Sequence, residues 1–199
     1  MILESFLFHP RKSNKAKTSK DRLIEVENGI QISIKCHFEN KAYPTLLFFH
    51  GNGEINSDYD DIALIYNKEK INFIIMDYRG YGLSNGSPNI KNILTDSIIA
   101  FNFVKTILKE QHYINKLFLM GRSLGSACVL NIINTNSNLI AGLIIESGFA
   151  NEKPLFHLIG MTPEQAEFKL EDGFLNCNKI KNYFGPLLII HAKEDHIIP

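Results

Sequence analysis

The sequence predicts an α/β fold built on a mostly parallel sheet, and three observations carry that prediction. Five short apolar runs recur along the chain without polar alternation, which is typical of strands buried on both faces. Stretches with apolar residues at helical spacing lie between several of these runs. Glycines and polar residues follow the runs, where the carboxyl ends of parallel strands form a common edge. Functional side chains are therefore expected at that edge.

The elements are expected in the following order. An Asn-Gly pair at residues 28–29 separates segments at 23–27 and 30–38, and this dipeptide is the strongest short signal for an antiparallel hairpin. The hairpin is expected to open the sheet. Buried strands are predicted at residues 45–49, 71–76, 117–120, 139–145 and 187–190. Helices are predicted at residues 57–67, 87–111 and 126–134, the second with Ser87 as its N-cap and Pro88 in its first turn.

Composition narrows the class of protein. The chain has 199 residues, of which 45% are hydrophobic, enough for one domain with a real core. Its 21 basic and 21 acidic residues cancel, so no global charge attracts nucleic acid or an anionic membrane. The three cysteines, Cys36, Cys128 and Cys177, form no C-x-x-C pair and are interpreted as reduced thiols of a cytoplasmic protein. No metal site is expected.

Two segments lie outside the predicted sheet and its crossover helices. Residues 1–22 form an N-terminal apolar and basic segment, followed by a domain at residues 23–199. The apolar start contains Glu4 and lacks a basic n-region, so it predicts neither a signal peptide nor a membrane span. Residues 11–22 carry six basic residues and are expected to be a solvated loop, with docking on an acidic surface as the alternative. Residues 149–185 are expected either to form a small lid or to cover the core, with a capping box at Thr162 starting a helix.

The chain is organised around Gly121-Arg122-Ser123-Leu124-Gly125, which follows an apolar run and precedes a helical stretch. This order indicates a strand, a sharp turn and a helix, with Ser123 at the tip of the turn. A serine in such a turn needs neighbours without side chains two residues away, because the strand and the helix otherwise cannot approach. Ser123 is therefore a candidate nucleophile.

Four motifs in order resemble the α/β-hydrolase superfamily, in particular its soluble serine hydrolases. They are His50-Gly51-Asn52-Gly53-Glu54, Asp77-Tyr78-Arg79-Gly80-Tyr81-Gly82-Leu83-Ser84, the turn around Ser123, and His191 to Pro199 with Asp195 inside it. Ala192 replaces a glycine that is usual in the last motif. The resemblance covers the chain from about residue 44 and implies the α/β-hydrolase fold.

The resemblance also implies the roles of individual residues. It makes Ser123 the nucleophile and Asp195 the acid that orients a histidine, while the backbone N–H groups of Asn52 and Leu124 form the oxyanion hole. Glu146, at the end of the preceding strand, is the alternative acid. The implied reaction is hydrolysis of a carboxylic ester or thioester through an acyl-serine intermediate, with a small-molecule substrate and neither cofactor nor metal. The oligomeric state is not predicted.

The catalytic histidine that the resemblance calls for is not found. In the family it follows a further strand downstream of the acid, whereas Pro199 lies four residues beyond Asp195. The expectation is thus a chain incomplete at its C-terminus, without the last strand and helix. Of the seven histidines, only His157 could turn toward Ser123, and it has no orienting acid. The alternatives are a binding protein or inactive fragment that lacks the base, and a peptidase or lyase of the same fold.

Overall fold

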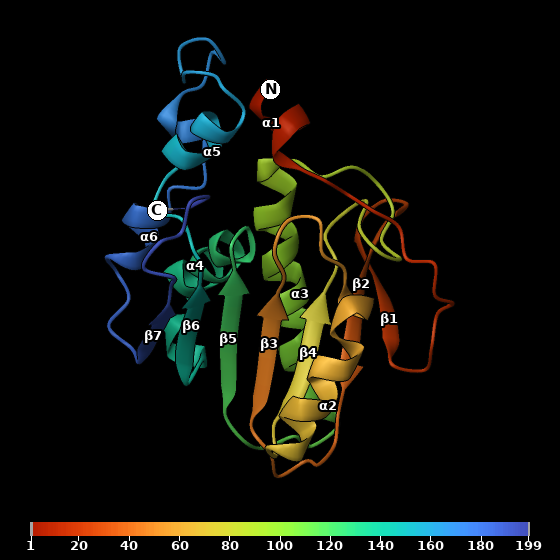
Figure 1. Ribbon diagram of the computed structural model, residues 1–199. Coiled ribbons are helices and arrows are strands. Elements are labelled where there is room, and N and C mark those ends of the chain that lie inside the picture. The colour runs from red at the N-terminus through yellow and green to blue at the C-terminus, as the bar shows by residue number, and fades with distance from the viewer. Residues whose placement is uncertain (1, 199) are drawn as a thin grey trace.

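The computed structural model describes residues 2–198, which form a seven-stranded sheet with helices on both faces (Figure 1). The strands are β1 (Asp21–Glu27), β2 (Ile30–His37), β3 (Thr45–Phe49), β4 (Asn72–Met76), β5 (Leu117–Arg122), β6 (Gly142–Glu146) and β7 (Leu187–Ile190). Their order across the sheet is β1-β2-β4-β3-β5-β6-β7. Strands β3 to β7 run parallel, while β1 and β2 pair antiparallel and β2 joins β4 antiparallel. The predicted hairpin and mixed sheet are confirmed.

The main helices are α2 (Asp60–Lys68), α3 (Ile90–Glu110) and α4 (Gly125–Asn136), and short 3-10 turns precede α2 and follow α4 at Asn56–Tyr59 and Ser137–Leu139. Helices α3 and α4 pack on one face of the sheet and α2 on the other (Figure 1). Successive residues of β3 point to opposite faces: Leu47 joins the core under α3 and α4, whereas Phe48 joins the core under α2. Both faces are therefore covered, which explains the unbroken apolar runs.

The start of α3 differs from the prediction. Asn89, not Ser87, is the N-cap: its side chain accepts the Asn92 N–H at 2.7 Å, and the Asn92 side chain accepts the Asn89 N–H at 2.9 Å. The Ser87 carbonyl instead accepts a hydrogen bond from the Asn92 side chain. The reciprocal Asn pair satisfies two N–H groups at once, so it outcompetes a single serine cap.

The N-terminal segment packs onto the domain. After α1 (Ile2–Leu7), the side chains of Leu7 and Phe8 are buried in the larger core. Arg11 donates to the Gly53 carbonyl at 2.7 Å and pairs with Asp58, and Lys15 pairs with Asp60 at 3.0 Å. The basic residues remain exposed, as a solvated loop implies, and two of them, Arg11 and Lys15, also pair with acidic side chains of the same chain.

Residues 149–185 fold as short helices and turns, namely α5 (Lys153–Leu158), a 3-10 turn (Leu170–Asp172) and α6 (Asn176–Ile180). The predicted capping box forms, with Thr162 N–H donating to Gln165 at 2.8 Å and Gln165 N–H to Thr162 at 3.3 Å. A helix does not follow, and Glu167 has a left-handed backbone with φ of 51°. Beside this region β7 lies at the sheet edge with its four side chains 42–60% exposed. In residues 2–198 no helix is both long and apolar enough to span a bilayer.

Candidate active site

Ser123 occupies a strained turn between β5 and α4. Its φ is +48°, a left-handed conformation that costs a residue with a side chain about 1–2 kcal/mol. The turn is held on both sides, since the Ser123 N–H donates to the Glu146 carbonyl at 2.9 Å and the Ser123 carbonyl accepts the Ser126 hydroxyl at 2.6 Å. The surrounding bonds thus keep Ser123 in a conformation that the chain would otherwise avoid.

The flanking glycines are required by close packing, as the spacing predicts. A Cβ on Gly121 would lie 2.4 Å from the Gly125 carbonyl oxygen. A Cβ on Gly125 would lie 2.0 Å from the Phe49 carbonyl oxygen. Both distances are far inside van der Waals contact, so the strand and the helix approach closely only because these positions lack side chains.

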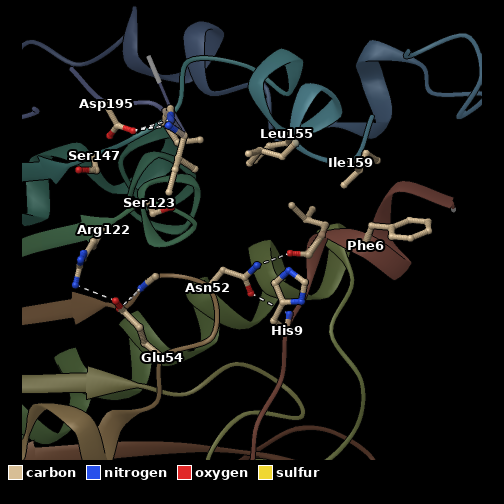
Figure 2. Close-up of a pocket in the computed structure, with 15 residues that line it drawn as sticks. Phe6, His9, Asn52, Glu54, Arg122, Ser123, Ser147, Leu155, Ile159 and Asp195 are labelled. Atoms are coloured by element: carbon tan, nitrogen blue, oxygen red, sulfur yellow. Dashed lines mark hydrogen bonds and ion pairs between the residues drawn. The ribbon is translucent and has the colours of Figure 1, made fainter. Parts of the chain in front are cut away.

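A cavity of about 820 Å³ opens at the carboxyl ends of the strands, with Ser123 on its wall (Figure 2). A smaller cavity of about 110 Å³ adjoins Ser123 and is lined by apolar side chains together with Asn52. Leu155 and Ile159 of the α5 region face Phe6 of α1 across the larger cavity (Figure 2). Its lining residues are Phe6, Leu7, His9, Gly51, Asn52, Glu54, Arg122, Ser123, Ser147, Leu155, Leu158, Ile159, Asp195, Ile197 and Ile198.

The two predicted oxyanion donors flank this space. Asn52 lines both cavities and Leu124 lines the smaller one. Within residues 2–198, neither backbone N–H has a hydrogen-bond acceptor. The Asn52 side chain is fixed by the N-terminal segment, since it donates to the Leu7 carbonyl at 2.6 Å and accepts the His9 N–H at 3.0 Å and the Tyr81 hydroxyl at 2.6 Å (Figure 2). These bonds leave the Asn52 N–H free to serve a ligand.

The two candidate acids differ in their surroundings. Asp195 lines the cavity, and its carboxylate accepts the N–H groups of Ile198 at 2.8 Å and Ile197 at 2.9 Å. These hydrogen bonds hold the pKa of Asp195 below its usual value, so it is ionised at neutral pH. Glu146 is not among the lining residues, and its carboxylate lies 3.8 Å from the Arg122 guanidinium. Of these two candidates, Asp195 shares the cavity with Ser123 and Glu146 does not.

The histidine that lines the cavity, His9, was not a candidate in the sequence analysis. His9 lines the wall beside Asn52, whereas His157 is absent from the lining among the described residues (Figure 2). Nothing in its local sequence signals this placement, because it depends on bonds to residues more than 40 positions away. His191 lies 3.6 Å from Asp195 but does not line the cavity. The buried His50 donates from its ring Nδ1 to the Gly51 carbonyl, 2.7 Å away, and so supports the loop that follows β3.

Charged groups brace the same loop. The Arg122 guanidinium lies 2.8 Å from one Glu54 oxygen, and the other Glu54 oxygen accepts the Gly51 N–H at 2.7 Å and the Tyr59 hydroxyl at 2.7 Å (Figure 2). Burial and the bond to Glu54 raise the pKa of Tyr59, so its hydroxyl stays protonated as a donor. Among the described residues, no group of three or more His, Cys, Asp or Glu side chains could hold a metal ion.

The sheet order, the serine turn and the cavity at the strand ends define the molecule as an α/β-hydrolase. Residues 40–171 match the family described as serine aminopeptidase, S33, and the chain belongs to that family. The match includes residues 50–54, which we call the oxyanion loop after its proposed role, and Ser123, and it stops before Asp195.

Relatives and solved structures agree with that assignment. The chain is 29% identical over 164 residues to the uncharacterized protein YfhR of Escherichia coli, covering 80% of this chain and 55% of YfhR. It therefore spans about half the length of that relative. An uncharacterized protein of Acanthamoeba polyphaga mimivirus is 30% identical over 236 aligned positions, covering 100% of this chain and 78% of its own. The Pyrococcus furiosus esterase Pf2001 has the same fold, with a TM-score of 0.70, 18% identity, and coverage of 95% of this chain and 79% of its own.

Proposed function

We propose that the chain is a serine hydrolase that cleaves carboxylic esters or thioesters through an acyl-serine intermediate. The observation that carries the proposal is Ser123, which lies in a strained turn on the cavity wall, while the N–H groups of Asn52 and Leu124 have no acceptor in residues 2–198. An acyl transfer needs this combination of an exposed hydroxyl and donors aimed at the oxygen where negative charge develops.

In the proposed reaction the Ser123 Oγ bonds to the substrate carbonyl carbon and the carbonyl oxygen becomes an oxyanion. The N–H groups of Asn52 and Leu124 stabilise that oxyanion, and Leu124 does so from the N-terminal end of α4, where the helix dipole favours an anion. The C–O or C–S bond to the leaving group then breaks, and the serine proton passes to that alcohol or thiol. Water attacks the acyl-serine in the same way and releases the acid.

Asp195 is proposed to orient the histidine that acts as general base. Among residues 2–198, no histidine both lines the cavity and pairs with Asp195, so none of them is proposed as the base. The proposal therefore places the base outside residues 2–198, on another segment or chain. Without a triad histidine, the oxyanion hole and substrate binding alone still accelerate acyl transfer by roughly 10³–10⁴ over water, with or without the serine. The proposal expects Ser123 to add a slow, serine-dependent reaction above that background when the ester is activated.

The cavity walls favour an ester with an apolar acyl group. Apolar side chains come from three separate parts of the chain, represented by Phe6, Leu155 and Ile198. Burial of apolar substrate surface against them contributes about 25 cal/mol per Å². The name of the structural relative Pf2001, an esterase, supports the same bond type. The three cysteines are free thiols, which supports the proposed cytoplasmic location.

The test is hydrolysis of p-nitrophenyl acetate, butyrate and octanoate and of a matched thioester by the purified chain and by Ser123→Ala. The proposal expects turnover that the substitution lowers to the background of the oxyanion hole alone, with kcat/KM rising from acetate to octanoate. Equal, residual turnover in both proteins would leave no role for Ser123 in hydrolysis. If octanoate esters bind with equal affinity to both proteins without turnover, the alternative of a non-catalytic binding protein is correct.

A further inference from the structure

A second cavity lies at the opposite end of the sheet from Ser123. It has a volume of about 640 Å³ and is formed where α3 ends and where β5 and β6 begin. The span from Leu117 to Arg122 along β5 separates the two ends, about 17 Å at 3.3 Å per residue. A ligand in this cavity therefore contacts neither Ser123 nor the oxyanion loop. We call it the basal groove. It is lined by Lys105, Leu108, Lys109, His112, Tyr113, Ile114, Asn115, Lys116, Leu117, Asn138, Leu139, Ile140 and Ala141.

The basal groove is strongly cationic, although the whole chain has no net charge. Three lysines and one histidine line it, and no aspartate or glutamate does. Within the described part of the chain, Lys105, Lys109 and Lys116 have no ion-pair partner, whereas Lys15, Lys35 and Arg79 elsewhere are paired. Unneutralised lysines around one concave surface create a positive potential that attracts anions.

The floor of the groove is apolar. Leu108 and Leu117 are buried beneath it, while Ile114 is 85% exposed and Leu139 is 44% exposed at its rim. An exposed isoleucine and leucine beside a cavity are a contact surface for apolar groups rather than for water. The groove thus combines a cationic rim with an apolar bed, and its volume lies in the range of small-molecule sites, about 300–1,000 Å³.

The turn that ends α3 directs an imidazole to the groove. Tyr113 N–H donates to the Leu108 carbonyl at 2.8 Å and His112 N–H to the Lys109 carbonyl at 3.2 Å, which leaves His112 in the left-handed region with φ of 60°. Glycine is the usual residue at that position of a helix end. Histidine costs conformational energy there, and its imidazole is one of the groups that line the groove.

We propose that the basal groove binds a small amphipathic anion, a molecule with a carboxylate or phosphate head and an apolar tail. The head lies against the lysine ammonium groups at the rim, and the tail lies on Leu117, Ile114 and Leu139. A purely polar anion such as inorganic phosphate leaves the apolar bed exposed, and an uncharged amphiphile leaves the lysines unpaired. This site is independent of the proposed hydrolase activity, because no groove residue lines the cavity that holds Ser123.

Binding of octanoate and octyl phosphate tests the proposal, with octyl glucoside as the uncharged control, each below its micelle-forming concentration. Titration into the ¹⁵N-labelled chain is expected to give saturable shifts at the amides of Lys109, His112 and Leu139. Lys109→Ala/Lys116→Ala is expected to weaken binding about tenfold, and raising the ionic strength from 0.01 to 0.15 M to weaken it further. The matched control Lys68→Ala/Lys91→Ala removes two exposed lysines from α2 and α3 and is expected to bind as the parent does.

Any of the following results would overturn the proposal. One is the absence of saturable shifts in the groove, and another is equal binding by the Lys109→Ala/Lys116→Ala variant or equal binding of octyl glucoside. The third is binding of a short polyglutamate peptide but not of octanoate or octyl phosphate, since the groove would then recognise an acidic protein segment. Shifts confined to residues around Ser123 would place the ligand in the other cavity and equally contradict a site in the basal groove.

Discussion

The charged groups of Arg122 and Glu54 are 2.8 Å apart and join the end of β5 to the loop that follows β3. Arg122 is the last residue of β5 and precedes Ser123, while Glu54 follows Asn52 in the loop after β3. Between β3 and β5 the last paired residues are Phe49 and Gly121, so the ladder between these two strands does not reach Arg122 or Glu54. The ion pair, with the Glu54 bond to the Gly51 N–H, therefore helps to set the separation of the two proposed oxyanion donors.

Removing either partner is expected to slow the reaction of Ser123. Glu54→Gln and Arg122→Ala should each lower the second-order rate of fluorophosphonate labelling by about tenfold, since misplaced donors lose transition-state stabilisation. The double variant should be little slower than either single one, because both break the same contact. Glu27→Gln breaks a comparable exposed pair with Arg79 and serves as the control. Additive losses in the double variant would show that Arg122 and Glu54 act separately.

Gly125→Ala is expected to destabilise the fold by about 3 kcal/mol or more, because the new Cβ meets the Phe49 carbonyl at 2.0 Å and β3 or α4 has to move. Gly160→Ala is the matched comparison: its φ is +66° but nothing lies within 4 Å of the new Cβ. Its cost should be about 1 kcal/mol, from backbone conformation alone. Urea unfolding of both variants measures the difference. Similar losses would mean that close packing does not require Gly125.

His37 is expected to make stability depend on pH between about 6.5 and 4. Burial, reinforced by the charge of Lys20, lowers the pKa of His37 to about 4. In this window the unfolded chain takes up a proton that the native chain does not, so the free energy of unfolding falls as the pH falls, by about 3 kcal/mol from this group. His37→Gln should remove this contribution to the pH dependence of the free energy of unfolding, while the contributions of the other titrating groups remain. Parallel pH profiles for the two proteins, measured by urea unfolding, would contradict the assignment.

His9→Gln tests whether the cavity histidine is the missing base. The backbone N–H of His9, not its imidazole, holds Asn52, so glutamine preserves the loop. The account predicts a change of less than about threefold in the labelling rate, because a general base contributes about 10²–10⁴. A loss of a hundredfold or more would make His9 the base.

The strands and the serine turn could be predicted because their causes are local. An unbroken apolar run is typical of a strand that is buried on both faces. Glycine is required at positions 121 and 125 because a side chain at either one would collide with nearby backbone atoms. The N-cap of α3 was predicted at the wrong residue because Asn89 and Ser87 are both good N-cap residues. Only the reciprocal hydrogen bonds between Asn89 and Asn92 decide between them.

The walls of the cavity could not be predicted, because they depend on contacts between distant segments. Leu7 and His9 reach the oxyanion loop through bonds to Asn52, 45 and 43 residues away, and no local pattern encodes such a contact. The same holds for Arg11. It was predicted to lie in a solvated basic loop, and in the structure its exposed side chain also donates to the Gly53 carbonyl. Charge spacing alone does not distinguish a free lysine or arginine from one that is docked.

Mass spectrometry of the chain after fluorophosphonate labelling locates the adduct and so tests whether Ser123 is the nucleophile. Ser147 provides a matched control, because it lines the same cavity and also has a positive φ, 45°. The account predicts an adduct on Ser123 alone, which is lost in Ser123→Ala and kept in Ser147→Ala. An adduct on Ser147, or no adduct on a folded chain after prolonged incubation, would contradict it.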